Sequence, residues 1–319
     1  MLSDYIYVIY TEKIMNPDTQ LTTEQIQLIC ARHDITYHSH ARVNTGFSHE
    51  VHRLNDDLII KLYNTSKPKN FETELALLKS AIDFPKPKLI ASHAATNKQD
   101  RSYIIMSYIA GFSLGSKWHL ATNEQREQLI KNISKTLQSI NQLDLHKFID
   151  TTDSWDIVVE KRIHKLVNKL RAKNVLNETQ ISKVLATLAA NKQYLANSQL
   201  YPVYWDIHFD NFIVDGNFEL QAIIDLENVE LAALDYPLFV IDKLTQEPHK
   251  YLREEDEKYA KVEDYSNLKH WYKKYYPLMF SFAHLDKRLN IYMLIDTLHL
   301  LLDWPNASEL YIQLEQLTK

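Results

Sequence analysis

The densest group of polar residues occupies positions 206–211, Asp-Ile-His-Phe-Asp-Asn, and a second acidic segment follows at 224–227, Ile-Asp-Leu-Glu. Short apolar segments between them predict two strands joined by a turn, which brings Asp206, Asn211 and Asp225 to one end of the unit. Phosphoryl transfer needs such a set, because one carboxylate can take the proton of an attacking hydroxyl while carboxylate and amide oxygens hold Mg²⁺ at the phosphates. A polar turn that uses Asp and Asn as turn-forming residues is the alternative.

Three residues nearer the N-terminus could complete such a site. Lys61 interrupts an otherwise apolar segment at 58–63, and a lysine on such a strand is unfavourable if it is buried without a partner. Glu74, in the middle of a predicted helix, could pair with it. Gly46 lies between two predicted strands, where a residue that tolerates positive φ lets the backbone approach a phosphate closely. Taken singly, a surface lysine, a solvated carboxylate and an ordinary hairpin turn also explain these residues.

The elements that must position these residues follow from the spacing of apolar side chains. Alternating residues in the first third of the chain predict strands at 35–43, 50–54, 58–63, 88–92 and 102–109. Helices are predicted there at about 22–32 and 68–82. Beyond Gly111 the spacing becomes helical, at 123–143, 155–176, 178–196, 237–246, 266–275, 287–303 and 307–317, with short strands at 200–205, 212–214 and 220–224.

This change of character near residues 109–111 divides the chain. The sequence therefore predicts an α+β fold of two lobes, a small N-terminal lobe with an antiparallel β-sheet (1–108) and a larger, mainly helical C-terminal lobe (109–319). Glycine is scarce, with four residues where average usage of about 7% would give about 22, which also favours a helix-rich chain. Two lobes joined by one crossing segment indicate a cleft, the usual place for an enzyme site.

Composition excludes several other classes of protein. The 36 basic and 41 acidic residues give a net charge of −5, and no strongly basic stripe is present, so a nucleic-acid partner is not expected. The single cysteine, Cys30, excludes an intramolecular disulfide. No apolar run approaches the roughly 18 residues of a membrane span, and the apolar N-terminus lacks the basic residues and cleavage site of a signal peptide. A cytoplasmic protein without a membrane partner is therefore expected.

In their order along the chain, these features resemble the aminoglycoside phosphotransferase/choline kinase superfamily, which shares the bilobal protein-kinase-like fold. The resemblance covers about residues 36–245. The segment at 104–114, Ile-Ile-Met-Ser-Tyr-Ile-Ala-Gly-Phe-Ser-Leu, looks like the hinge of that family. The remaining matches are to its catalytic loop (Asp206, His208 and Asn211), its metal-binding aspartate (Asp225) and its phosphate-anchoring ion pair (Lys61 and Glu74).

The resemblance implies a small-molecule kinase that transfers the γ-phosphate of ATP or GTP to a hydroxyl group of its substrate. Asp206 would orient the acceptor hydroxyl, and Asn211 and Asp225 would bind Mg²⁺. The nucleotide would contact the residues of the loop, the ion pair and the hinge, namely Gly46, Lys61, Glu74, Ser107, Tyr108 and Ile109. A slightly acidic protein suits a cationic acceptor such as an aminoglycoside, but choline, homoserine, a sugar-like metabolite and a macrolide all remain open.

Some positions depart from the family pattern or have a role that stays open. Members of the family usually have His-Gly before the catalytic aspartate, whereas this chain has Tyr204 and Trp205. The departure motivates a second hypothesis, a catalytically degenerate nucleotide-binding module. Asp235 is expected to cap a helix rather than bind a ligand, and His208 to be a structural residue of the loop. Glu227 is assigned equally to the site and to the surface.

Overall fold

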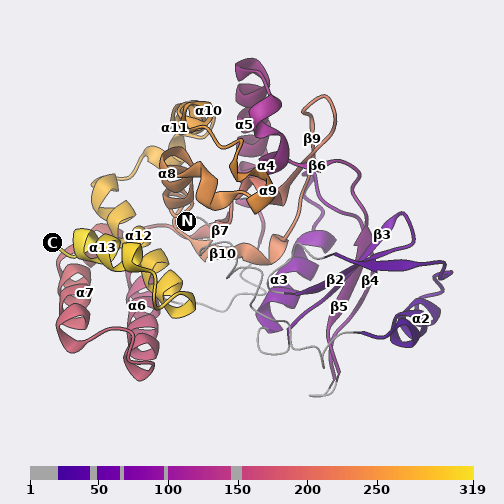
Figure 1. Cartoon of the computed structure of the whole chain (residues 1–319), viewed down its shortest axis with the longest axis horizontal. Helices are drawn as coiled ribbons and strands as arrows, with labels where there is room; N and C mark the ends of the chain where they lie inside the picture. Colours follow the sequence, from indigo (N-terminus) through magenta and orange to yellow (C-terminus); the bar gives the residue numbers. More distant parts are fainter. Residues whose placement is uncertain (1–20, 44–48, 65–67, 97–99, 145–152) are drawn as a thin grey trace.

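Five antiparallel strands form the sheet of the N-terminal region (Figure 1). The computed structural model describes residues 21–43, 49–64, 68–96, 100–144 and 153–319. The strands are β1 (His40–Arg42), β2 (Glu50–Leu54), β3 (Leu58–Leu62), β4 (Leu89–His93) and β5 (Tyr103–Ser107), in the spatial order β1-β2-β3-β5-β4. Strand β3 therefore lies in the centre of the sheet. Its residue Lys61 has Val51 of β2 and Ile104 of β5 as cross-strand partners.

Two helices cover the two faces of this sheet. Ile60 and Leu62 pack against Ile29 of α2 (Thr23–Arg32). Successive side chains of a strand point to opposite faces, so Lys61 projects to the other face. That face is covered by α3 (Pro68–Lys79), the helix that carries Glu74. The strand period of two and the helix between β3 and β4 thus bring the predicted lysine and glutamate to the same side.

The first predicted strand is shorter than expected. The sequence predicts a strand over 35–43, but only His40–Arg42 pairs with β2. The backbone just before β1 forms hydrogen bonds with the side chain of Asn55 instead of with β2. Asn55 accepts hydrogen bonds from the N–H groups of His38 and Ser39 and donates one to the carbonyl of Thr36. Asn55 itself adopts a left-handed conformation (φ 51°) in the predicted turn between β2 and β3. Hydrogen bonds to the side chain of this turn residue therefore replace the strand pairing that was expected for the residues before His40.

The helical part of the chain surrounds two small sheets. Strands β6 (Phe112–Ser113), β8 (Phe212–Val214) and β9 (Leu220–Ile223) form one, and β7 (Tyr201–Tyr204) pairs with β10 (Val229–Ala232) in the other. Short 3-10 turns η4 (Phe209–Asn211) and η5 (Leu226–Asn228) lie at the ends of these strands. The longer helices are α5 (Asn123–Ile140), α6 (Trp155–Ala172), α7 (Glu178–Asn191), α8 (Leu238–Gln246), α11 (Leu268–Tyr275), α12 (Leu285–Asp303) and α13 (Ser308–Leu317). The shorter ones are α4 (Leu114–Lys117), η2 (Trp118–Leu120), η3 (Lys192–Leu195), η6 (Pro248–Tyr251), α9 (Glu254–Glu257), α10 (Val262–Tyr265) and η7 (Pro277–Phe280).

This arrangement confirms the bilobal α+β fold expected from the sequence, with a small antiparallel sheet and a larger helical part (Figure 1). Helices α6, α7, α12 and α13 lie together at the end of the molecule opposite the five-stranded sheet. Strand β10 was not predicted, although its sequence, Val-Glu-Leu-Ala, alternates apolar and polar residues at its start. Four residues are too few for such a pattern to be distinguished from a loop.

Asp235 does not cap a helix, so the sequence-based prediction is wrong. Helix α8 begins after Pro237, without a side-chain cap. The Asp235 carboxylate is instead fully buried and accepts hydrogen bonds from Arg288 Nε at 2.5 Å and Nη2 at 2.8 Å, and from Tyr292. A buried carboxylate is stable only when it is paired and fully hydrogen-bonded, and this pair joins α12 to the segment before α8.

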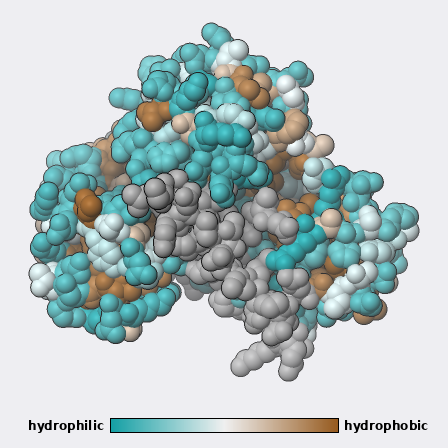
Figure 2. Space-filling view, in the orientation of Figure 1, coloured by the Kyte–Doolittle hydropathy of each residue, from teal (hydrophilic) through white to brown (hydrophobic). Residues whose placement is uncertain are grey.

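Polar side chains dominate the face of the described part that Figure 2 shows. Figure 2 shows a mainly hydrophilic face, on which hydrophobic residues lie singly or in small groups. No helix among the described residues is long and apolar enough to cross a membrane. Cys30 is buried on α2, where burial raises the pKa of its thiol, so the thiolate needed for reactivity is disfavoured.

Candidate active site

Lys61 and Glu74 meet on the α3 side of the sheet. The Lys61 Nζ lies 2.7 Å from the Glu74 Oε2, and both side chains are buried. Tyr63 Oη donates a 2.5 Å hydrogen bond to the same oxygen. Burial lowers the pKa of Lys61, but Asp225, Glu74 and Glu227 outweigh that effect and hold it well above its ordinary value. The lysine is therefore a fixed positive charge at the base of the site.

Glu227 belongs to this cluster rather than to the surface. Its Oε2 lies 3.0 Å from Lys61 Nζ, its Oε1 accepts a hydrogen bond from Asn70 at 3.1 Å, and its side chain is only 6% exposed. His49 Nε2 lies 2.9 Å from Oε1; because the backbone N–H of Asn64 donates to His49 Nδ1, the imidazole presents its Nε2–H to the carboxylate. Burial raises the pKa of Glu227, but Lys61 and His49 lower it to about 2.

Asp206 is held by two amide side chains at the end of β7. Asn211 Nδ2 and Asn228 Nδ2 donate to Asp206 Oδ2 at 3.1 and 2.9 Å, and His208 Nε2 lies 3.3 Å from Oδ1. The carboxylate is 19% exposed, so it remains reachable. Burial raises its pKa above the ordinary value. Asn228, which was not predicted, fixes the orientation of the carboxylate from the end of η5, just before β10.

Asp225 lies two residues beyond the end of β9, and its own backbone is left-handed. Its φ is 54°, its side chain is 48% exposed, and its Oδ1 lies 2.8 Å from Lys61 Nζ. Two segments far apart in the sequence are thereby joined, since β3 belongs to the N-terminal sheet and Asp225 to the helical part. The turn conformation aims the carboxylate back at the lysine.

Oxygen atoms suitable for a divalent cation converge here. Asn211 donates through its Nδ2 to Asp206, so its Oδ1 is the atom of the amide that can act as an acceptor or a metal ligand. Glu227 Oε2 is buried and lies 3.0 Å from Lys61 Nζ and 2.7 Å from His49 Nε2, so it is a carboxylate oxygen of the same cluster. The described residues contain no group of three or more His, Cys, Asp or Glu arranged as a metal cage. Mg²⁺ does not require one, because it is commonly held by one or two carboxylates together with substrate phosphates, so these residues fit that ion.

The expected hinge leaves one backbone donor available. The Ser107 N–H donates to the carbonyl of Lys88 at 2.9 Å, and the Tyr108 N–H donates to that of Asp57 at 2.6 Å. Within the described residues no hydrogen bond engages the N–H of Ile109. Of the three residues expected to face a nucleotide base, Ile109 is therefore the one with a free donor. Gly46 lies outside the described residues.

Trp205, at the position where the family that the chain resembles usually has glycine, does not displace the loop at 206–211. Its N–H donates to the carbonyl of Asn228 at 3.4 Å, which continues the β7–β10 ladder by one residue. Its ring packs against Phe239 (centroids 6.5 Å apart) and Tyr236 (6.3 Å). The indole is thus accommodated by α8, while Asp206 keeps its contacts with Asn211.

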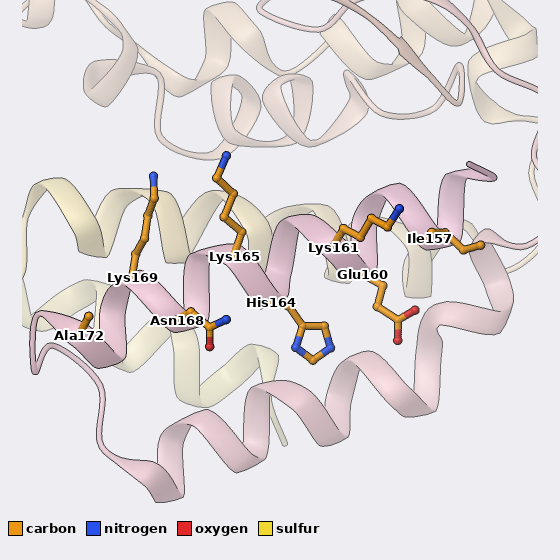
Figure 3. A pocket seen from close by; sticks show the side chains of 8 residues that line it. All are labelled: Ile157, Glu160, Lys161, His164, Lys165, Asn168, Lys169 and Ala172. Carbon is orange, nitrogen blue, oxygen red and sulfur yellow. The ribbon is translucent and has the colours of Figure 1, made fainter. Parts of the chain in front are cut away.

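A separate hollow of about 750 Å³ runs along α6. Figure 3 shows its lining side chains, of which Lys161, Lys165 and Lys169 project to the same side of the helix. Among the described residues that line it, none belongs to the Lys61 or Asp206 clusters. The volume of a hollow therefore does not locate the site; the converging polar contacts do.

Comparison with known proteins identifies the family. Residues 39–241 match the phosphotransferase enzyme family, and the chain belongs to that family. Comparison with curated proteins gave no match. Asp206, Asn211, Asp225, Lys61 and Glu74 all lie inside the matched segment.

Solved structures of aminoglycoside phosphotransferases share the fold. The GDP complex of aminoglycoside 2'-phosphotransferase-IIIa is 14% identical, with a TM-score of 0.63 over 94% of this chain and 99% of that one. The streptomycin–ATP–APH(2")-IIa ternary complex is 13% identical, with a TM-score of 0.65 over 94% and 96%. A thermostable APH(4)-Ia mutant with AMP-PNP and hygromycin B is 12% identical, with a TM-score of 0.64 over 92% and 97%. These likenesses establish the kinase-like fold.

Proposed function

We propose that this protein is a small-molecule kinase that transfers the γ-phosphate of a nucleoside triphosphate to a hydroxyl group. One observation carries the proposal: Lys61 of the N-terminal sheet meets Asp225 at 2.8 Å, while Asp206 and Asn211 lie bonded to each other on the neighbouring loop. A phosphate anchor, oxygen ligands and a carboxylate base are thereby gathered in one place, as phosphoryl transfer requires. The boundary between the lobes, 108/109, falls between β5 and β6.

The nucleotide side of the site uses the Lys61–Glu74 pair and the hinge. Lys61, held by Glu74, would bind the α- and β-phosphates, and Ile109 would offer its N–H to the base, beside Ser107 and Tyr108. Similar structures contain GDP or ADP, which supports a purine nucleotide and leaves both ATP and GTP as donors. Asn211, Asp225 and Glu227 would hold Mg²⁺, which when bound neutralises charge on the phosphates.

Asp206 would orient the acceptor hydroxyl. As the hydroxyl oxygen forms its bond to the γ-phosphorus, the bond to the bridging oxygen breaks, the nucleoside diphosphate leaves, and Asp206 takes the hydroxyl proton. Asn211 and Asn228 keep the carboxylate in place. The pKa of Asp206, raised by burial, lies closer to neutral than that of a solvated aspartate, which favours its action as a base.

The presence of both the nucleotide-binding pair and the proposed base argues against a degenerate binding module. Such a module would need Lys61 and Glu74 for nucleotide binding, but it would not need Asp206 bonded by two asparagines. Transfer from labelled ATP or GTP to a panel of hydroxyl compounds, including aminoglycosides, choline, homoserine and sugars, tests the proposal. We expect Asp206→Asn to reduce turnover by about 10²–10⁴-fold, with nucleotide binding by thermal shift nearly unchanged. Equal turnover in that variant would refute the role of Asp206.

A further inference from the structure

A second carboxylate, Glu230, lies on β10, close in sequence to a residue that holds Asp206. Asn228, which donates to Asp206 Oδ2 at 2.9 Å, directly precedes β10. Contacts also link Glu230 to the residue before Asp206. The ring of Trp205 lies 6.3 Å from that of Tyr236, whose hydroxyl accepts a hydrogen bond from the Arg162 that pairs with Glu230.

Glu230 is fixed in orientation and paired. Arg162 of α6 donates to Glu230 Oε1 at 3.1 Å and to Oε2 at 2.7 Å, and its Nη1 also donates to Tyr236 Oη at 2.8 Å. Such a two-point contact between guanidinium and carboxylate is planar and geometrically specific. The side chains remain 23% and 28% exposed. The pair therefore presents fixed donors and acceptors to a ligand but carries no net charge.

A second neutral pair is connected to Asp206 through Tyr251 and His208. Lys243 of α8 is paired with Asp296 of α12. The Lys243 Nζ lies 5.2 Å from the centre of the Tyr251 ring, and that ring lies 5.1 Å from the ring of His208, the neighbour of Asp206. Like Glu230, the carboxylate of Asp296 therefore already has its own cation.

Trp205 adds an aromatic surface that contacts Tyr236, the acceptor of a hydrogen bond from Arg162, and Phe239 of α8. It directly precedes Asp206 and is partly exposed. Its ring lies nearly parallel to that of Phe239 (23°), and Phe239 is one helical turn from Lys243, so both lie on the same face of α8. A ring face beside uncharged sets of donors and acceptors suits a ligand with an apolar C–H face and several hydroxyl groups.

We infer that the acceptor is an uncharged, sugar-like polyol whose hydroxyls bind the Glu230–Arg162 pair and whose ring packs on Trp205. The inference rests on the proposed kinase function. One hydroxyl reaches Asp206, its oxygen bonds to the γ-phosphorus, its proton passes to Asp206, and the nucleoside diphosphate leaves with the electron pair of the broken bond. A polycation would instead need carboxylates without a cation of their own, and neither Glu230 nor Asp296 meets that requirement.

Matched acceptors test the charge preference directly. The full chain, with Mg²⁺ and ATP or GTP, would be assayed on neutral sugars and polyols, each beside its amino-substituted counterpart (glucose with glucosamine, for example), and on aminoglycosides. We expect kcat/KM for the neutral member to be higher by about tenfold or more, the effect of one lost or mismatched hydrogen bond to a charged group. Products would be identified by mass, so that ATP hydrolysis is not counted as transfer.

Variants of the pair test its role in binding. Glu230→Gln, which keeps the shape of the side chain, and Arg162→Gln should each raise KM for the neutral acceptor about tenfold or more while changing kcat much less. Arg171→Gln and Glu178→Gln are the matched controls, because Arg171 makes the same two-point contact with Glu178 from the same helix α6, at an exposed site. The control variants should leave both constants unchanged.

The outcomes separate this inference from the proposed function. Preference for the amino-substituted acceptors, an unchanged KM in Glu230→Gln, or no transfer to any neutral member would overturn the sugar-like acceptor. Nucleotide binding, followed by thermal shift in the same variants, reports on the fold and on the kinase hypothesis independently. Failure of the wild-type chain to bind any Mg²⁺–nucleotide would overturn the proposed function, and the inference with it.

Discussion

His49 and Glu227 join the two parts of the molecule. Their side chains come from residues 178 positions apart, and His49 Nε2 lies 2.9 Å from Glu227 Oε1. His49 is nearly fully buried just before β2, whereas Glu227 belongs to η5, the turn that ends in Asn228 beside Asp206. The contact therefore fastens the sheet to the segment that carries Asp225.

Loss of this contact should weaken the fold. We expect His49→Leu to lower the free energy of unfolding by about 1–3 kcal/mol, because a buried hydrogen bond to a charged group is removed. Urea unfolding followed by circular dichroism measures the change. His38→Ala is the control, since the His38 side chain is exposed and its loss should stay within about 0.5 kcal/mol. Equal stability of His49→Leu and the wild type would contradict the prediction.

Asn228 should matter for turnover although it does not belong to the family pattern. We expect Asn228→Ala to reduce kcat by about tenfold, the equivalent of about 1.4 kcal/mol, because Asp206 loses the donor at 2.9 Å that orients it. Nucleotide affinity should not change. Asn217→Ala in the exposed turn after β8 is the control. A fall in nucleotide affinity without a fall in kcat would show that Asn228 acts elsewhere.

The pair Asp235–Arg288 should dominate the stability of the helical part. Arg288→Met leaves a buried carboxylate without its cation, for which we expect a loss of about 3–5 kcal/mol in the free energy of unfolding. Replacing both residues, Asp235→Leu with Arg288→Met, should cost much less, since no charge stays buried. Denaturant unfolding measures both losses of stability, from the shift of the midpoint at an unchanged m-value. A double variant no more stable than the single one would argue against this account.

Glu50 should make stability depend on pH in the acid range. Burial raises its pKa, but hydrogen bonds from His52, the Leu21 N–H and Arg101 lower it to about 2, against an ordinary value of 4.5. Because the folded-state pKa is the lower one, the stabilisation is present above pH 4.5 and is lost as the pH falls toward 2. The difference corresponds to about 3 kcal/mol.

Comparing Glu50→Gln with the wild type tests this. The variant should be less stable at neutral pH, and the gap should close between about pH 5 and pH 2. Glu72→Gln, an exposed carboxylate of α3, is the control and should show no such closing gap. A difference between Glu50→Gln and the wild type that stays constant with pH would exclude titration of Glu50 as the cause.

Local patterns allowed the elements and much of the site to be predicted. Alternation of apolar residues places Lys61 on β3, and helical spacing places Glu74 on α3, so their pairing follows from two short segments. The spacing within residues 206–211 likewise sets Asp206 and Asn211 on one loop. The structure brings these residues together, and their chemical roles stay predictions.

Contacts made across long stretches of sequence could not be predicted. Asn70 and His49 reach Glu227 over 157 and 178 residues, and no local pattern marks such partners. For Asp235, a local pattern was present but led to the wrong prediction. An aspartate shortly before a helix usually caps it, but burial beside Arg288, 53 residues away, overrides that preference. Tertiary packing therefore decides where local signals are weak or compete.

The segment between β5 and β6 leaves little freedom to the joint between the lobes. Ser107 and Tyr108 are bonded to the N-terminal sheet and its β2–β3 turn. At the other end Gly111 (φ 149°) lies so close to β8 that a Cβ atom would come within 2.5 Å of the Val214 carbonyl oxygen. Ile109 and Ala110 are thus the residues of this segment that lie between its two held ends. Since no hydrogen bond within the described residues engages the Ile109 N–H, a base bound there, as proposed, would also hold the middle of the segment.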